Sequence, residues 1–224
     1  MSIATFGSAP EHPHYTFDSF VVSECSRAAF DAAKAVASQP GRVHNPLVLC
    51  GESGSGKSHL LHAIAHAVRP GKVLRISGQS LVSRIHAAIR YQQDDELLCL
   101  LSTFDLLLLD EFPRRGRATV RYVLELLRQL RARGVQIVVT MPRHRWLLGS
   151  AAFTVAIGAP DLVARKQIAR REAERKGIVL AEEALRAIAE RSTGTANEVR
   201  CAVARLAAEQ LFTPPPDRAL PARA

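Results

Sequence analysis

Aromatic residues are scarce in this chain. They make up 5% of its 224 residues, and only one of them is tryptophan. A core with so few rings must be built mainly from Leu, Val, Ile and Ala, which suits helices packed on an apolar parallel sheet. Hydrophobic residues at 47% and charged residues at 23% are typical of a globular protein and exclude a disordered chain. The length suffices for one full-sized domain, or for a domain plus a small appendage.

Paired cysteines and membrane segments are also lacking. The cysteines lie far apart and form no C-x-x-C pair: Cys25, Cys50, Cys99 and Cys201. This spacing disfavours a zinc site or a disulfide framework and predicts a reducing compartment. The N-terminus has neither the basic nor the apolar region of a signal peptide, and the apolar stretch Phe104–Leu109 is far too short to span a bilayer. We therefore expect a cytoplasmic protein with no membrane partner.

Positive charge is in excess, with 30 Lys and Arg against 21 Asp and Glu and a net charge of +9. A basic protein favours polyanions, so nucleotide or nucleic acid is an expected ligand. The alternative is that this charge is only solvated surface.

Strand and helix patterns alternate through the first two thirds of the chain. The expected strands are Leu47–Cys50, Lys72–Ile76, Phe104–Leu109, Val135–Thr140 and Thr154–Ile157. The expected helices are Ala28–Ala37, His59–Val68, Ser80–Arg90 and Thr119–Arg133. The alternation predicts a doubly wound α/β domain over residues 15–160, with a parallel sheet flanked by helices.

After Pro160 the strands stop. Three helices are expected, at Leu162–Arg175, Ala181–Ser192 and Ala196–Phe212, and they predict a small all-α lid domain over residues 161–212. Residues 1–14 are polar and proline-punctuated, which predicts a flexible leader. Residues 213–224 are proline-rich and predict a disordered tail.

One motif indicates a specific chemistry. The segment Gly51-Glu52-Ser53-Gly54-Ser55-Gly56-Lys57-Ser58 matches G-x-x-x-x-G-K-[ST] in full, between an apolar strand and a helix. Its backbone N–H groups and the following helix are suited to cradle phosphates. We expect Lys57 to reach the β- and γ-phosphates and Ser58 to bind Mg²⁺. The whole loop, with His59 directly after it, is the predicted site for ATP or ADP.

A second pair of residues completes this prediction. Asp110 and Glu111 follow an apolar strand, where Asp110 would hold Mg²⁺ and Glu111 would polarise the attacking water. The alternative is that the two acids merely cap a strand end. Thr140, at the end of another strand, stands where P-loop ATPases of the AAA+ type carry a polar γ-phosphate sensor. His59, His62 and His66 have helical spacing, but no further ligand is evident, so we expect structural histidines rather than a metal site.

Three segments resemble a known family. Tyr15–Val22 (YTFDSFVV), Asn45–Leu47 and Ser58–Ile64 (SHLLHAI) are similar to the AAA+ domain of the bacterial replication initiator DnaA, which its relative Hda shares. The resemblance runs from about Tyr15 to Phe212. It implies an AAA+ fold, and it implies that Phe20 and Val21 contact the adenine base.

The chain departs from the family pattern at several points. The sequence ends at Ala224, so we expect no helix-turn-helix domain like that of DnaA, and residues 1–14 contain no Hda-like clamp motif. The interval RHRWLLGSAAFTVAIGA lacks the arginine-finger motif expected before Pro160. Pro142 stands at the family's sensor-1 acid, and Asn197 replaces its sensor-2 arginine. Arg200, one helical turn later, could reach the same face.

These features favour a DnaA-related regulator or adaptor in replication initiation, with slow hydrolysis at best. Its partners would be an initiator of the DnaA type or a helicase, and a homo-oligomer stays open. A nucleotide-dependent scaffold without useful hydrolysis is a further alternative, against which Glu111 argues.

The main alternative is an ATPase that binds single-stranded DNA, similar to a helicase loader. Phosphate contacts would come from Arg84, Arg90 and the run Arg114–Arg117, and base stacking from Tyr91. The arginine run could equally be the solvated start of a helix.

Overall fold

The structure is a computed structural model that describes residues 12–68, 71–142, 152–192 and 194–212. The chain divides into two compact units, residues 1–158 and residues 159–224. In the described residues, no helix is both long and apolar enough to cross a membrane. The predicted tail and residues 1–11 of the predicted leader lie outside the described residues.

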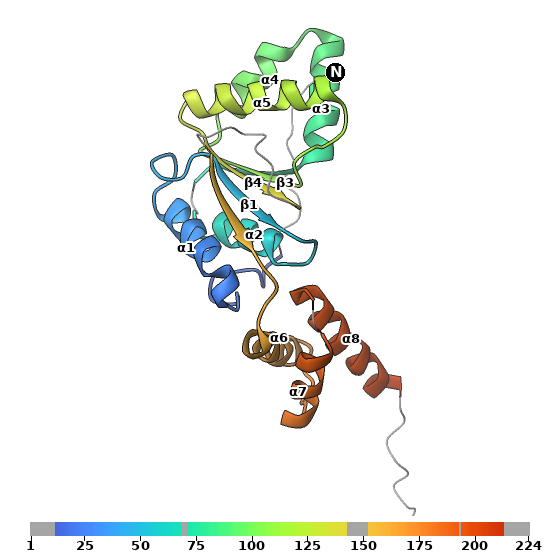
Figure 1. Ribbon diagram of the computed structural model, residues 1–224. Helices are drawn as coiled ribbons and strands as arrows, with labels where there is room; N and C mark the ends of the chain where they lie inside the picture. The colour runs from blue at the N-terminus through green and yellow to red at the C-terminus, as the bar shows by residue number, and fades with distance from the viewer. Residues whose placement is uncertain (1–11, 69–70, 143–151, 193, 213–224) are drawn as a thin grey trace, which may run out of the picture. The chain divides into compact units, whose positions relative to one another are not determined.

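The first unit is built on a parallel sheet (Figure 1). Its strands are β1 (Leu47–Gly51), β2 (Val73–Ser77), β3 (Leu106–Asp110), β4 (Gln136–Met141) and β5 (Phe153–Ile157). They lie in the order β2-β3-β4-β1-β5, and every neighbouring pair is parallel.

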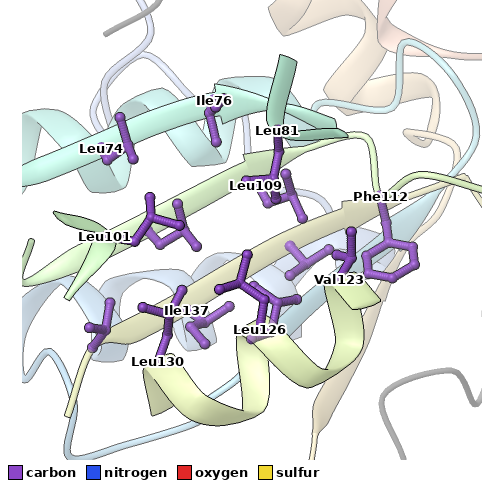
Figure 2. Packing of buried hydrophobic residues seen from close by; sticks show 14 of the residues in the cluster. Leu74, Ile76, Leu81, Leu101, Leu109, Phe112, Val123, Leu126, Leu130 and Ile137 are labelled. Carbon is purple, nitrogen blue, oxygen red and sulfur yellow. The ribbon is translucent and has the colours of Figure 1, made fainter. Parts of the chain in front are cut away.

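The apolar runs of β1, β3 and β4 bury side chains on both faces of the sheet, because successive side chains point to opposite sides. In β3, Leu107 and Leu109 face one core cluster, whereas Leu106 and Leu108 face the other. Figure 2 shows the first cluster, in which Leu109 and Ile137 of the sheet pack against Leu126 and Leu130. Burial on both faces explains why these runs show no polar alternation in the sequence.

Helices cover each face (Figure 1). One face carries α1 (Glu24–Ser38) and α2 (Lys57–Ala67). The other carries α3 (Gly78–Tyr91), α4 (Asp94–Leu101) and α5 (Arg117–Ala132). Helix α4 was not predicted, although its first turn is acidic; its apolar side chains Leu97, Leu98 and Leu101 are buried. The first helix begins earlier than predicted, because Ser26 Oγ accepts a hydrogen bond from the Ser23 N–H and fixes the start at Glu24.

The second unit contains α6 (Leu162–Arg175), α7 (Glu182–Arg191) and α8 (Ala196–Phe212). They enclose a small core of their own from Ala169, Leu185, Ile188, Val199 and Val203. Asp161 caps α6, since its carboxylate accepts a hydrogen bond from the Ala164 N–H at 2.8 Å. The predicted all-α region after Pro160 is therefore present.

Candidate functional site

The strand order places the predicted site residues at one edge of the sheet. Strand β4 lies between β1 and β3, and all three run parallel. Their C-terminal ends therefore bring together the loop after Gly51, the Asp110 carboxylate and the Thr140 hydroxyl. Ligands of open α/β sheets bind at this edge of the strands.

The glycine-rich loop has a backbone conformation that side chains at its glycine positions would hinder. Gly54 and Gly56 have positive φ angles of 79° and 109°, and α2 begins directly after them. A Cβ on Gly51 would lie 2.6 Å from the Ile157 carbonyl oxygen and 2.7 Å from Ser55 Oγ. The loop thus wraps tightly and turns into a helix N-terminus, which is a ready anion site.

Lys57 lies within this loop. Its ammonium donates hydrogen bonds to the carbonyl oxygens of Gly51 at 2.8 Å and Glu52 at 2.7 Å. Burial lowers the pKa of Lys57 below its ordinary value, and the Asp110 and Glu111 carboxylates oppose that shift. A buried cation that is bound by two neutral carbonyls is stabilised further when a phosphate supplies the opposite charge.

Ser55 gives a second sign that the loop suits a phosphate. Its side chain is buried, and Ser55 Oγ has no hydrogen-bond partner among the described residues. Buried hydroxyls are nearly always paired, so one that is unpaired beside a helix N-terminus fits an additional acceptor. The loop and its lysine therefore fit a nucleotide phosphate.

Oxygen atoms gather next to the loop. Ser58 Oγ donates to Asp110 Oδ1 at 3.2 Å, and Thr140 Oγ1 donates to the same oxygen at 2.8 Å. Hydroxyl and carboxylate oxygens are the ligand types that Mg²⁺ prefers. Ser58 is exposed and Asp110 is half-buried, so the pair is open to a cation bound beside a phosphate.

Glu111 has an unusual backbone. Its φ angle is +61°, in the left-handed region that costs a non-glycine residue about 1–2 kcal/mol. Its N–H donates to Thr140 Oγ1 at 2.7 Å, and the next N–H, of Phe112, donates to the Thr140 carbonyl at 2.9 Å. The Phe112 ring is buried, whereas the Glu111 side chain is exposed. The bend thus turns the Glu111 carboxylate out of the core.

Gly78 was not among the predicted site residues. It opens α3, and a Cβ at this position would overlap the carbonyl oxygen of Glu111. A glycine directly after a predicted strand was the available signal, since glycine allows such close backbone approach.

The N-terminal segment packs on α2 and on the loop. Phe20 is buried, and its Cε2 lies 3.0 Å from the Cβ position of Gly56. His59 stacks on Tyr15 at 4.6 Å between ring centroids and meets the edge of Phe20 at 5.1 Å. Val21 is half-buried directly after Phe20. The structure therefore brings Phe20 and His59 to the base of the loop.

Two further histidines of α2 contact the same segment. His62 Nδ1 accepts a hydrogen bond from the His12 N–H at 3.3 Å, and His66 Nε2 lies 3.1 Å from the His12 carbonyl oxygen. Burial of the imidazole is the main cause that lowers the pKa of His62 to about 4, and the charge of Arg75 is the second. Among the described residues, no group of three His, Cys, Asp or Glu is arranged to hold a metal ion.

Other predicted residues belong to other parts of the chain. Asn197 is an exposed residue of α8 and lies in the second unit, as does Arg200. The arginine-finger interval falls largely on residues 143–151, outside the described residues, and its later part forms β5. Arg114 and Arg115 are exposed before α5, and Arg117 is the first residue of that helix.

A sequence model of the bacterial DnaA ATPase domain matches residues 12–152. The chain belongs to the DnaA ATPase-domain family. The chromosomal replication initiator DnaA of Thermomicrobium roseum is 32% identical over 227 residues, which cover 93% of this chain and 49% of that protein. The chain spans about half the length of the curated DnaA relatives that it matches.

Solved DnaA structures share the fold. Domain III of DnaA from Thermotoga maritima has a TM-score of 0.82 and 27% identity, over 91% of both chains. A DnaA bound to AMPPCP and single-stranded DNA has a TM-score of 0.76 and 22% identity, over 87% of this chain and 65% of that one. The predicted family and the predicted AAA+ architecture, a parallel α/β sheet followed by helices, are thus confirmed.

Proposed function

We propose that this chain binds ATP or ADP with Mg²⁺ and acts as a regulator or adaptor in the initiation of DNA replication. The observation that carries the nucleotide site is the hydrogen bond between Ser58 and Asp110 beside the buried Lys57 ammonium. The solved DnaA that contains AMPPCP supports the same ligand class for this family.

Each residue has a proposed role. Lys57 and the loop N–H groups bind the phosphates, and Ser58 and Asp110 hold Mg²⁺. Phe20, Val21 and His59 form the side of the site nearest the base. Bound Mg²⁺ would neutralise phosphate charge. Glu111 would activate the attacking water by accepting its proton.

Hydrolysis is proposed to be slow. An arginine finger is worth about 10³–10⁵ in phosphoryl-transfer rate, and the interval before Pro160 lacks the family's finger motif. Asn197, at the sensor-2 position, carries no charge that could replace the arginine. A nucleotide-held conformation, rather than rapid turnover, suits a regulator.

Calorimetric titration with ATP and ADP, with and without Mg²⁺, tests the nucleotide site. We expect saturable binding by the wild type and by Lys72→Ala, which changes an exposed lysine just before β2. Lys57→Ala should lose binding because the phosphates lose their buried cation. A wild type that binds neither nucleotide contradicts the proposal.

A pull-down tests the replication role. The wild type and Lys57→Ala are each mixed with a DnaA-type initiator and with a replicative helicase, in the presence of nucleotide. Capture of one of these partners by the wild type alone supports a nucleotide-dependent adaptor. Capture of neither partner contradicts it.

A second candidate is a single-stranded-DNA-binding ATPase similar to a helicase loader. Its support is the end of α3, where Tyr91 is 57% exposed and Ile89 is 49% exposed on either side of the exposed Arg90. Exposed rings stack on bases and arginines bind phosphates. The solved relative that contains single-stranded DNA is consistent with this class of ligand.

Fluorescence anisotropy with labelled single strands over a salt series separates the two candidates. Tyr91→Ala and Arg90→Ala should weaken binding, and loss of one phosphate contact should reduce the salt slope by about 0.7. Arg27→Ala, an exposed arginine of α1 on the other face of the sheet, is the matched control. Absence of binding at low salt removes the second candidate.

A further inference from the structure

The Thr140 hydroxyl is fully buried and is hydrogen-bonded in two directions. Its exposed fraction is 0%, although it stands at the functional edge of the sheet. It donates to Asp110 Oδ1 at 2.8 Å and accepts from the Glu111 N–H at 2.7 Å. Both distances lie in the normal range for strong hydrogen bonds.

This arrangement uses the only proton that the hydroxyl has to give. A threonine hydroxyl supplies one donor and two acceptor lone pairs. The donor is directed at Asp110, so only a lone pair is left, and a lone pair cannot bind a phosphate oxygen. The γ-phosphate contact that the sequence position predicts would require the hydrogen bond to Asp110 to break.

The same residue controls the backbone of the acid pair. The Thr140 carbonyl accepts from the Phe112 N–H at 2.9 Å, so side chain and main chain together hold two successive N–H groups after Asp110. Between these groups lies the left-handed Glu111, with Gly78 pressed against its carbonyl. A strained backbone conformation persists where several surrounding contacts hold it in place.

We propose that Thr140 is a positioning residue for the metal side of the site and not a phosphate ligand. Its hydroxyl orients the Asp110 carboxylate toward Ser58 and holds Glu111 in the conformation that turns its side chain out of the core. The role of Thr140 in orienting a metal ligand rests on the proposed nucleotide function. Its role in holding the Glu111 backbone does not depend on that function.

Two variants separate these roles by titration with ATP and ADP, in Mg²⁺ and in EDTA. Thr140→Val keeps the shape and removes the hydroxyl, whereas Thr140→Ser keeps the hydroxyl. We expect Thr140→Val to lose about 10–100-fold in Mg²⁺-dependent affinity, as other residues that orient metal ligands do. In EDTA it should bind ATP and ADP like the wild type, and Thr140→Ser should resemble the wild type throughout. A loss confined to ATP, with the Mg²⁺ dependence intact, would instead establish a phosphate contact.

Amide hydrogen exchange at Glu111 tests the positioning without any nucleotide. The Glu111 amide should be protected in the wild type and in Thr140→Ser, and should exchange at least about tenfold faster in Thr140→Val. Equal exchange in all three overturns the inference. Thr140→Ala is the second variant should the valine disturb packing, which circular dichroism checks. Failure of the wild type to bind nucleotide would overturn the proposed function and leave this exchange test standing.

Discussion

The Ser58 hydroxyl and the Asp110 carboxylate share a hydrogen bond of 3.2 Å although 52 residues separate them in the sequence. Ser58 is the second residue of α2 and Asp110 is the last residue of β3. The parallel sheet creates this meeting, because β1 leads into α2 at the same edge where β3 ends. A phosphate bound by the loop would therefore have a hydroxyl and a carboxylate beside it for a shared cation.

Asp110→Asn should uncouple nucleotide binding from Mg²⁺. The substitution keeps the shape of the side chain and removes the charge that a hard cation requires. We expect the gain in ATP affinity on adding Mg²⁺ to fall by about 10–100-fold, with affinity in EDTA unchanged, as measured by calorimetric titration. Asp105→Asn, just before the other end of β3, is the control and should keep the wild-type response. Equal Mg²⁺ dependence in Asp110→Asn and the wild type would rule out the carboxylate as a ligand.

Gly56→Ala should abolish nucleotide binding by distorting the loop. The residue has a φ angle of +109°, and the added Cβ would lie 3.0 Å from the Phe20 ring. Gly134→Ala is a matched control, because Gly134 has a φ angle of +87° but no heavy atom within 4 Å of its Cβ position. Both variants should lose about 1 kcal/mol or more of stability in urea unfolding. Only Gly56→Ala should lose ATP binding, and an intact site in Gly56→Ala would contradict the prediction.

Glu111→Gly should be more stable than Glu111→Ala by about 1 kcal/mol. Glycine adopts a φ angle of +61° without the steric cost that alanine bears. Glu125, inside α5 and exposed, supplies the opposite case: there Glu125→Gly should be less stable than Glu125→Ala by about 1 kcal/mol. Urea unfolding of the four variants measures both differences. The same order of Gly and Ala at both positions would mean that Glu111 is not strained.

The loop and the acid pair could be predicted from the sequence because each depends on the order of neighbouring segments along the chain. A strand, a glycine-rich turn and a helix follow one another around Lys57, and an apolar run leads directly into Asp110. The strand order and the Ser58–Asp110 contact, by contrast, depend on pairing between distant segments, which no local pattern specifies.

The features that were not predicted also depend on contacts between distant segments. The left-handed conformation of Glu111 arises from hydrogen bonds to Thr140, which lies 29 residues away. The short helix α4 has only eight residues, and its burial against α3 and α5 decides its formation more than its own pattern does. The three histidines of α2 have helical spacing, but only the folded N-terminal segment shows what they contact.

His62 should make the first unit less stable in acid. Its pKa in the folded protein is about 4, against an ordinary value of 6.5, mainly because the imidazole is buried. Between these two pH values the unfolded chain binds a proton that the folded chain does not, so the free energy of unfolding falls as the pH drops through this window. The shift corresponds to a loss of up to about 3 kcal/mol. Besides burial, Arg75, His12 and His66 lower the pKa of His62, whereas Asp110 raises it.

His62→Gln should remove this pH dependence. Glutamine keeps an acceptor for the His12 N–H, which donates to His62 Nδ1, and it does not titrate. His86→Gln changes an exposed histidine of α3 and is the matched control. Urea unfolding at pH 7, 6, 5 and 4.5 should show a steep fall in stability for the wild type and His86→Gln, and a shallower one for His62→Gln. Parallel curves for all three proteins would show that another group governs the acid response.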